Sequence, residues 1–132
     1  MGKILQYDLI KKISEKGISD IYTAYDEEKK LDVDVNLISK DSLNSSDVAR
    51  IKQSFEAIKK VDNKGILTIY DVLDESNSLA IVQEKFEAGP ISNYLKNNRF
   101  DLKTFLELSI VLSESLGYVH EENIIYRNII FF

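Results

Sequence analysis

The chain has 132 residues, which suits one domain with a modest core, and its apolar content of 44% and charged content of 30% are typical of a globular protein. The net charge of −5 argues against nucleic acid as the main partner, because binding phosphate needs a basic surface. No apolar run is long enough to cross a bilayer, and the lack of cysteine excludes disulfides and zinc–thiolate sites. We therefore expect a cytoplasmic protein with no membrane span and no nucleic-acid partner.

The first part of the chain predicts a hairpin followed by a third strand. Residues 4–13 lead into the first strand, residues 18–25 form the second, and Gly17 lies in the turn between them. The segment 31–37 alternates apolar and polar residues with period two, which predicts a half-buried strand. One face carries Leu31, Val33, Val35 and Leu37, and the other face carries Asp32, Asp34 and Asn36.

A helix and two further strands are predicted next. The segment 44–47 offers N-cap residues, and apolar residues then recur at helical spacing over about fifteen residues, so that this helix covers one face of the sheet. These apolar residues are Val48, Ile51, Phe55, Ile58 and Val61. Residues 66–73 and 79–84 predict two strands joined by the turn 74–78.

The last part of the chain predicts a short helix over residues 91–96 and a long helix over residues 101–121, N-capped by Asp101. The long helix has too many apolar residues for one stripe, which indicates burial on more than one side. Residues 124–126 and 129–132 predict short apolar strands that form a terminal hairpin. The fold class is α+β, with a five-stranded antiparallel sheet, one packed helix, and then a short and a long helix.

Several short stretches match the motifs of protein kinases in the right order and spacing. Positions 14–21 have the frame of G-x-G-x-x-G-x-V, and Val33-Asp34-Val35-Asn36 stands at V-A-I-K. Residues 79–89 are similar to the fifth strand and the hinge, with Gln83 at the gatekeeper place, and residues 116–128 are similar to the approach to H-R-D. The chain thus resembles a serine/threonine protein kinase up to the catalytic loop. The resemblance implies an N-lobe over 1–87 and the start of a C-lobe over 88–132, in a single structural unit.

The resemblance also shows which family residues are missing. The Lys that contacts the α and β phosphates is Asn36 here, and the ion-pair Glu of the helix falls on Ser54. Glu56 is near in sequence but points about 200° away around the helix. Asp34 replaces the small Ala under the adenine, and a carboxylate there would repel a triphosphate.

The glycine-rich loop is altered in the same way. Its three glycine places are Ser14, Lys16 and Ser19, whose Cβ atoms stand where backbone amides must approach phosphate, while Gly17 remains for the turn. The resemblance therefore implies a lid without a nucleotide beneath it. We expect no cofactor, and no metal either, because the one histidine, His120, has no partner at ligand spacing.

The catalytic aspartate of the family is lost in both alignments of the chain's end. Either Tyr126-Arg127-Asn128 stands at H-R-D, with Asn128 unable to act as a base, or the catalytic loop is deleted. The D-F-G segment and most of the C-lobe lie beyond these residues in the family, whose domain needs about twice this length. We therefore expect no phosphoryl transfer.

The main hypothesis is a truncated, catalytically inactive kinase-like domain (a pseudokinase) that acts as a scaffold or regulator by binding another protein or itself, as a homodimer or larger assembly that includes swapped forms. Its predicted partner surface is Phe105, Leu108, Leu112, Leu116, Ile129, Ile130 and Phe131, whose apolar side chains a C-lobe would otherwise cover. A second hypothesis is the N-terminal piece of a longer kinase-like regulator.

Two more hypotheses stay open on the sequence. The chain could act as a nucleotide or ligand sensor that uses only the backbone of the hinge, Glu84, Lys85 and Phe86. It could also be a small α+β interaction domain unrelated to kinases. The abundance of Asn, Lys and Ile favours a microbial source with an AT-rich genome.

Overall fold

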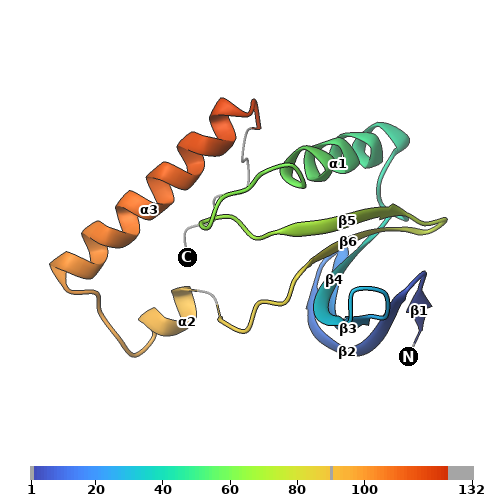
Figure 1. The fold of residues 1–132 in the computed structure, drawn as a ribbon, viewed down its shortest axis with the longest axis horizontal. Coiled ribbons are helices and arrows are strands. Elements are labelled where there is room, and N and C mark those ends of the chain that lie inside the picture. Colours follow the sequence, from blue (N-terminus) through green and yellow to red (C-terminus); the bar gives the residue numbers. More distant parts are fainter. Residues whose placement is uncertain (1, 90, 125–132) are drawn as a thin grey trace. The chain divides into compact units, whose positions relative to one another are not determined.

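The computed structural model describes residues 2–89 and 91–124, which fall into two compact units (Figure 1). Of these residues, the first unit contains those up to Val61 together with Leu67–Phe86, and the second contains Asp62–Ile66 and those from Glu87 on. The elements of the first unit are β1 (Lys3–Ile4), β2 (Tyr7–Lys16), β3 (Ser19–Asp26), β4 (Leu31–Ser39), α1 (Ser45–Ile58), β5 (Ile69–Asp74) and β6 (Ser78–Glu84). Those of the second unit are α2 (Ile91–Leu95) and α3 (Leu102–Glu121).

The sheet of the first unit is antiparallel, with the strand order β1-β2-β3-β4-β6-β5. This confirms the predicted α+β class and the five strands predicted for the sheet. The sheet has one strand more than predicted, because β1 pairs with β2 through Ile4 and Tyr7. The tight turn between them has Leu5 at φ 50°, a conformation that the identity of a leucine does not predict.

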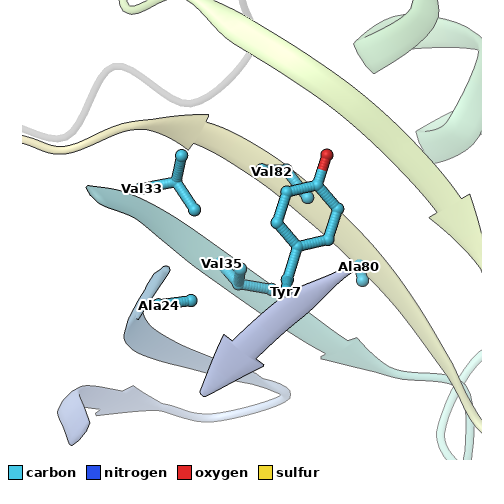
Figure 2. Packing of buried hydrophobic residues seen from close by; sticks show 6 residues of the cluster. All are labelled: Tyr7, Ala24, Val33, Val35, Ala80 and Val82. Atoms are coloured by element: carbon cyan, nitrogen blue, oxygen red, sulfur yellow. The ribbon is translucent and has the colours of Figure 1, made fainter. Parts of the chain in front are cut away.

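One face of the sheet carries a core of small and β-branched residues around a tyrosine. This cluster consists of Tyr7, Ala24, Val33, Val35, Ala80 and Val82 (Figure 2). The side chains come from β2, β3, β4 and β6, and each is at most 1% exposed. The predicted apolar face of β4 is confirmed, since Leu31 and Leu37 pack against the same cluster. The prediction of a half-buried strand is wrong for its middle, because Asp34 on the other face is buried as well.

The opposite face carries a second core beneath α1. Its buried members are Ile38, Ile69, Val72, Leu79 and Ile81. The helix packs against them with Ile51, Phe55 and Ile58, which follow the predicted helical spacing. Figure 1 shows α1 running alongside β5 and β6. The Asn44 side chain accepts a hydrogen bond from the Asp47 amide at 2.8 Å, so the predicted N-cap is confirmed.

The second unit contains both predicted C-terminal helices. Asp101 caps α3 as predicted, since its carboxylate accepts a hydrogen bond from the Thr104 amide at 2.7 Å, and this bond lowers the pKa of Asp101. The rings of Tyr94 and Phe100 stack at 5.3 Å between centroids. Apart from Ile124, which is not in a strand, the predicted terminal hairpin lies outside the described residues. None of the helices in the described ranges combines the length and hydropathy needed to cross a membrane.

Candidate functional site

The lid hairpin, residues Ser14 to Ser19, forms as the sequence predicts. Lys16 pairs with Ser19, which leaves a two-residue turn of Gly17 and Ile18. Gly17 has φ 61°, and such turns favour glycine because a Cβ atom disfavours positive φ. Gly17 is thus required by the backbone of the turn, as expected.

The third glycine place and the lysine place of the kinase pattern are joined by a hydrogen bond. Ser19 begins β3, and its hydroxyl donates to the side-chain oxygen of Asn36 on β4. β3 and β4 pair with Ile21 opposite Asn36, so the two polar side chains lie diagonally on the same face of the sheet. In the kinase pattern both positions serve phosphate, whereas here they satisfy each other.

Asp34 lies on the same face as Asn36 and is only 3% exposed. The backbone amide of Phe86 donates to its Oδ2 at 3.2 Å, and the hydroxyl of Thr23 lies 3.5 Å from its Oδ1. The sequence predicted a carboxylate under the adenine place that would repel a triphosphate, and this repulsion stays a prediction. The structure adds that this carboxylate is buried and binds donors of its own unit, because β3 and the segment after β6 flank it on both sides.

The hinge segment, Glu84–Phe86, is tied to the sheet by further contacts. Glu84 closes a pair with Thr68, in which the Glu84 amide donates to the Thr68 carbonyl at 2.9 Å and the Thr68 amide donates to the Glu84 carboxylate at 2.8 Å. The Lys85 ammonium lies 3.0 Å from the carboxylate of Asp32. The three hinge residues that the sequence singled out therefore all have partners in the first unit.

The ion-pair place on α1 is separate from these residues. The hydroxyl of Ser54 donates to the Arg50 carbonyl one turn earlier, at 2.9 Å, and the side chain is exposed. It lies off the face that Ile51 and Phe55 turn to the core. A serine bonded to its own helix cannot supply the carboxylate of the kinase ion pair.

A lysine near the lid is held by carboxylates. Lys12 on β2 lies 3.0 Å from both Glu15 and Asp20, and hydrogen bonds to these two groups raise the pKa of Lys12. Its ammonium group is thus engaged within the hairpin.

The structure brings some predicted site residues together and leaves others apart. One face of the sheet brings together Ser19, Asn36, Asp34 and the amide of Phe86. Ser14 on β2 pairs with Ile21, which lies on the same face of β3 as Ser19. Asn128, Ile129, Ile130 and Phe131 lie outside the described residues. Sequence reasoning missed Thr23 as a neighbour of Asp34. The signal was the strand register, because Thr23 is directly opposite Asp34 once Ile21 is placed opposite Asn36.

The predicted partner surface on α3 is exposed in part. Phe105 is 54% and Leu112 is 50% exposed, whereas Leu108 and Leu116 are half-buried. The helix also exposes apolar residues that were not singled out: Leu102, Leu106, Ile110 and Val111. These four are among the apolar residues of the long helix that exceed the number needed for one stripe. Which of them are exposed depends on packing, which the sequence pattern does not specify.

An open cavity of about 530 Å³ lies beside the start of α1. Lys40 and Lys52 line it, but both contact Asp74, at 2.5 and 3.0 Å. These ion pairs lower the pKa of Asp74, with the hydrogen bond from Lys40 as the largest cause. Within residues 2–89 and 91–124, no group of three or more His, Cys, Asp or Glu side chains could hold a metal ion.

Comparisons with known proteins agree with the kinase-like fold. A family model described as protein tyrosine and serine/threonine kinase matches residues 8–131. A probable serine/threonine-protein kinase of Dictyostelium discoideum, kinX, is 42% identical over 53 residues, which are 39% of this chain and 5% of that protein. The match therefore spans a small part of that relative.

Proposed function

The chain belongs to the protein tyrosine and serine/threonine kinase family, and from this premise we propose that it is a kinase-like domain without phosphoryl-transfer activity that works by binding another protein. The observation that carries the proposal is the contact between Asn36 and Ser19. An amide replaces the cation that would bind phosphate, and it is bonded to a side chain at a glycine place of the lid. Ser54, bonded to its own helix, supports the same conclusion.

The protein-binding part of the proposal rests on α3. Side chains such as Phe105 and Leu112 expose apolar surface, and contiguous apolar surface is typical of partner sites. The first partner we propose is a second copy of the chain, in a homodimer or larger assembly. The cytoplasmic location, the microbial source and the absence of a nucleic-acid partner stay predictions from composition.

Phosphoryl transfer is tested by incubating the purified chain with radiolabelled ATP, with Mg²⁺ or Mn²⁺, and with casein as a generic substrate. The expected result is no label in the chain or in casein above a heat-denatured sample. A variant with Asn36→Ala serves as control, because any activity that needs this site would change with it. Label that appears with the wild type and decreases with Asn36→Ala would refute the proposed inactivity.

Self-association is tested by sedimentation velocity over a wide concentration range. We expect the wild type to form dimers or larger species at high concentration, and the double variant Phe105→Glu/Leu112→Glu to stay monomeric, because two charges then lie on the apolar surface. Lys103→Glu is the matched control, since this residue is also exposed on α3 but is charged already. A compact wild-type monomer at the highest concentration would remove the second copy as the partner.

A further inference from the structure

Asp34 is a carboxylate in a position that is costly unless its oxygens are satisfied. It lies in the middle of β4, opposite Thr23 on β3 and Gln83 on β6, and is almost fully buried. Burying an ionised carboxylate without partners costs several kcal/mol, whereas hydrogen bonds to its oxygens offset that cost. The amide of Phe86 and the hydroxyl of Thr23 are its donors here.

The Phe86 amide is the donor that matters most for ligand binding. β6 ends at Glu84, so the Phe86 amide lies beyond the hydrogen-bond ladder of the sheet and needs an acceptor. That acceptor is Oδ2 of Asp34, at 3.2 Å. A ligand that accepts a hydrogen bond from the Phe86 amide would have to displace Asp34, because one amide hydrogen makes one good hydrogen bond.

We propose that Asp34 is a built-in ligand of the hinge, whose carboxylate occupies the Phe86 amide and keeps a neutral purine base from binding there. A ring nitrogen of a purine and a carboxylate oxygen are both hydrogen-bond acceptors, so they compete for this donor. A base that entered would also lie against a buried negative charge stripped of its hydrogen bond, at a high desolvation cost. The inference rests on the proposed function, since it explains how the hinge of an inactive domain is kept closed.

The first test measures hydrogen exchange at the Phe86 amide by NMR in the full chain. In Asp34→Ala the amide loses its acceptor, and we expect its exchange to become about tenfold faster. Asp34→Ser is the second variant, which keeps a polar side chain too short to reach Phe86 if the alanine variant does not fold. The matched control is Asp32→Asn, which removes the negative charge that pairs with Lys85, the neighbour of Phe86, and should change the exchange by less than about twofold.

The second test titrates adenosine, an uncharged nucleoside, into the same variants and follows the amide signals of Thr23, Gln83 and Phe86. We expect saturable shifts in Asp34→Ala or Asp34→Ser, and none in the wild type or in Asp32→Asn. Equal behaviour of the wild type and the Asp34 variants would overturn the inference, whether all bind adenosine or none does. Unchanged exchange at Phe86 in both Asp34 variants would overturn it as well.

These outcomes are distinct from a failure of the proposed function. The proposed function fails if the wild-type chain transfers phosphate from ATP, a result that appears without any variant. The inference about Asp34 fails if the Asp34 variants and the wild type show the same adenosine binding, or the same exchange at Phe86, while the wild type transfers no phosphate.

Discussion

The two faces of β4 place neighbouring residues of one strand in opposite chemical surroundings. Val33 and Val35 are fully buried in the cluster around Tyr7, where the removal of apolar surface from water stabilises the sheet. Asp34 and Asn36 lie on the other face, where hydrogen bonds to Phe86 and Ser19 satisfy them. The difference shows how a kinase-like sheet can lose the residues of its phosphate site and keep its core, because the two sets alternate along the strand.

The largest expected effect is a charge on the core face. Val35→Asp buries a carboxylate in a cluster that is apolar apart from the Tyr7 hydroxyl, and we expect it to lower the free energy of unfolding by at least about 4 kcal/mol or to prevent folding. Urea unfolding followed by circular dichroism measures the loss. Asn36→Asp is the matched control on the other face, where Ser19 can still donate, and should cost less than about 2 kcal/mol. Equal losses in the two variants would contradict the contrast between the faces.

A second prediction concerns pH and Tyr7, the tyrosine at the centre of the cluster on this face. Burial, followed by the nearby charges of Asp71, Asp26 and Glu28, raises the pKa of Tyr7 from its ordinary value of 10.0 to about 12. Because the folded pKa is the higher one, this contribution to stability is fully present below pH 10.0 and is lost as the pH rises through about 12.

The measurement is urea unfolding at several pH values between pH 8 and the highest pH at which the wild type still folds. The wild type should lose free energy of unfolding above pH 10.0 with an extra slope of up to about 1.4 kcal/mol per pH unit relative to Tyr7→Phe. Tyr94→Phe, which removes a hydroxyl from an exposed ring, is the control and should keep the wild-type slope. Parallel pH profiles for the wild type and Tyr7→Phe would mean that Tyr7 ionises equally in both states.

A smaller effect is expected on the polar face. Thr23→Val keeps the shape of the side chain but removes the hydroxyl that lies 3.5 Å from Asp34. This contact is long, so we expect a loss of about 0.5–1 kcal/mol in the free energy of unfolding. The amide of Phe86 should keep its protection from exchange, since its own bond to Asp34 is unchanged. A loss comparable to that of Val35→Asp would contradict the small contribution expected from this contact.

The smallest expected effect is the return of the missing cation. Asn36→Lys restores the residue type of the kinase pattern, but Asp34 stays on the same face and side chains stay at the glycine places Ser14 and Ser19. We therefore expect no rise in melting temperature with Mg²⁺ and ATP, in the variant or in the wild type. A rise that increases with ATP concentration would show native-state binding and would mean that one cation is enough to recover the site.

The features that the sequence predicted correctly depend on local chemistry. The alternation from Leu31 to Leu37, the positive φ of Gly17 and the caps Asn44 and Asp101 all follow from a few neighbouring residues. Such signals are strong because period and cap geometry act within one turn or one strand. The assignment of Asn36 to the lysine place of the kinase pattern needs only the position of a motif, and it stays a prediction.

The partners of the site residues could not be read in the same way. Ser19 is 17 residues from Asn36, and Phe86 is 52 residues from Asp34, so each contact depends on how the strands are paired. A shift of one residue in that register would turn every side chain of a strand to the other face. The sequence did not predict β1 for a similar reason, because its two-residue pairing with β2 depends on the turn at Leu5.

The sequence by itself determined the order of the elements, the two faces of β4, the helix caps and the residue types that replace the kinase phosphate site. Only the tertiary structure decided that Asp34 is buried and bonded to the Phe86 amide, and that Ser19 and Asn36 bind each other. The physical reason is that a side chain's type and period are local, whereas burial and hydrogen-bond partners arise when strands distant along the chain are brought side by side.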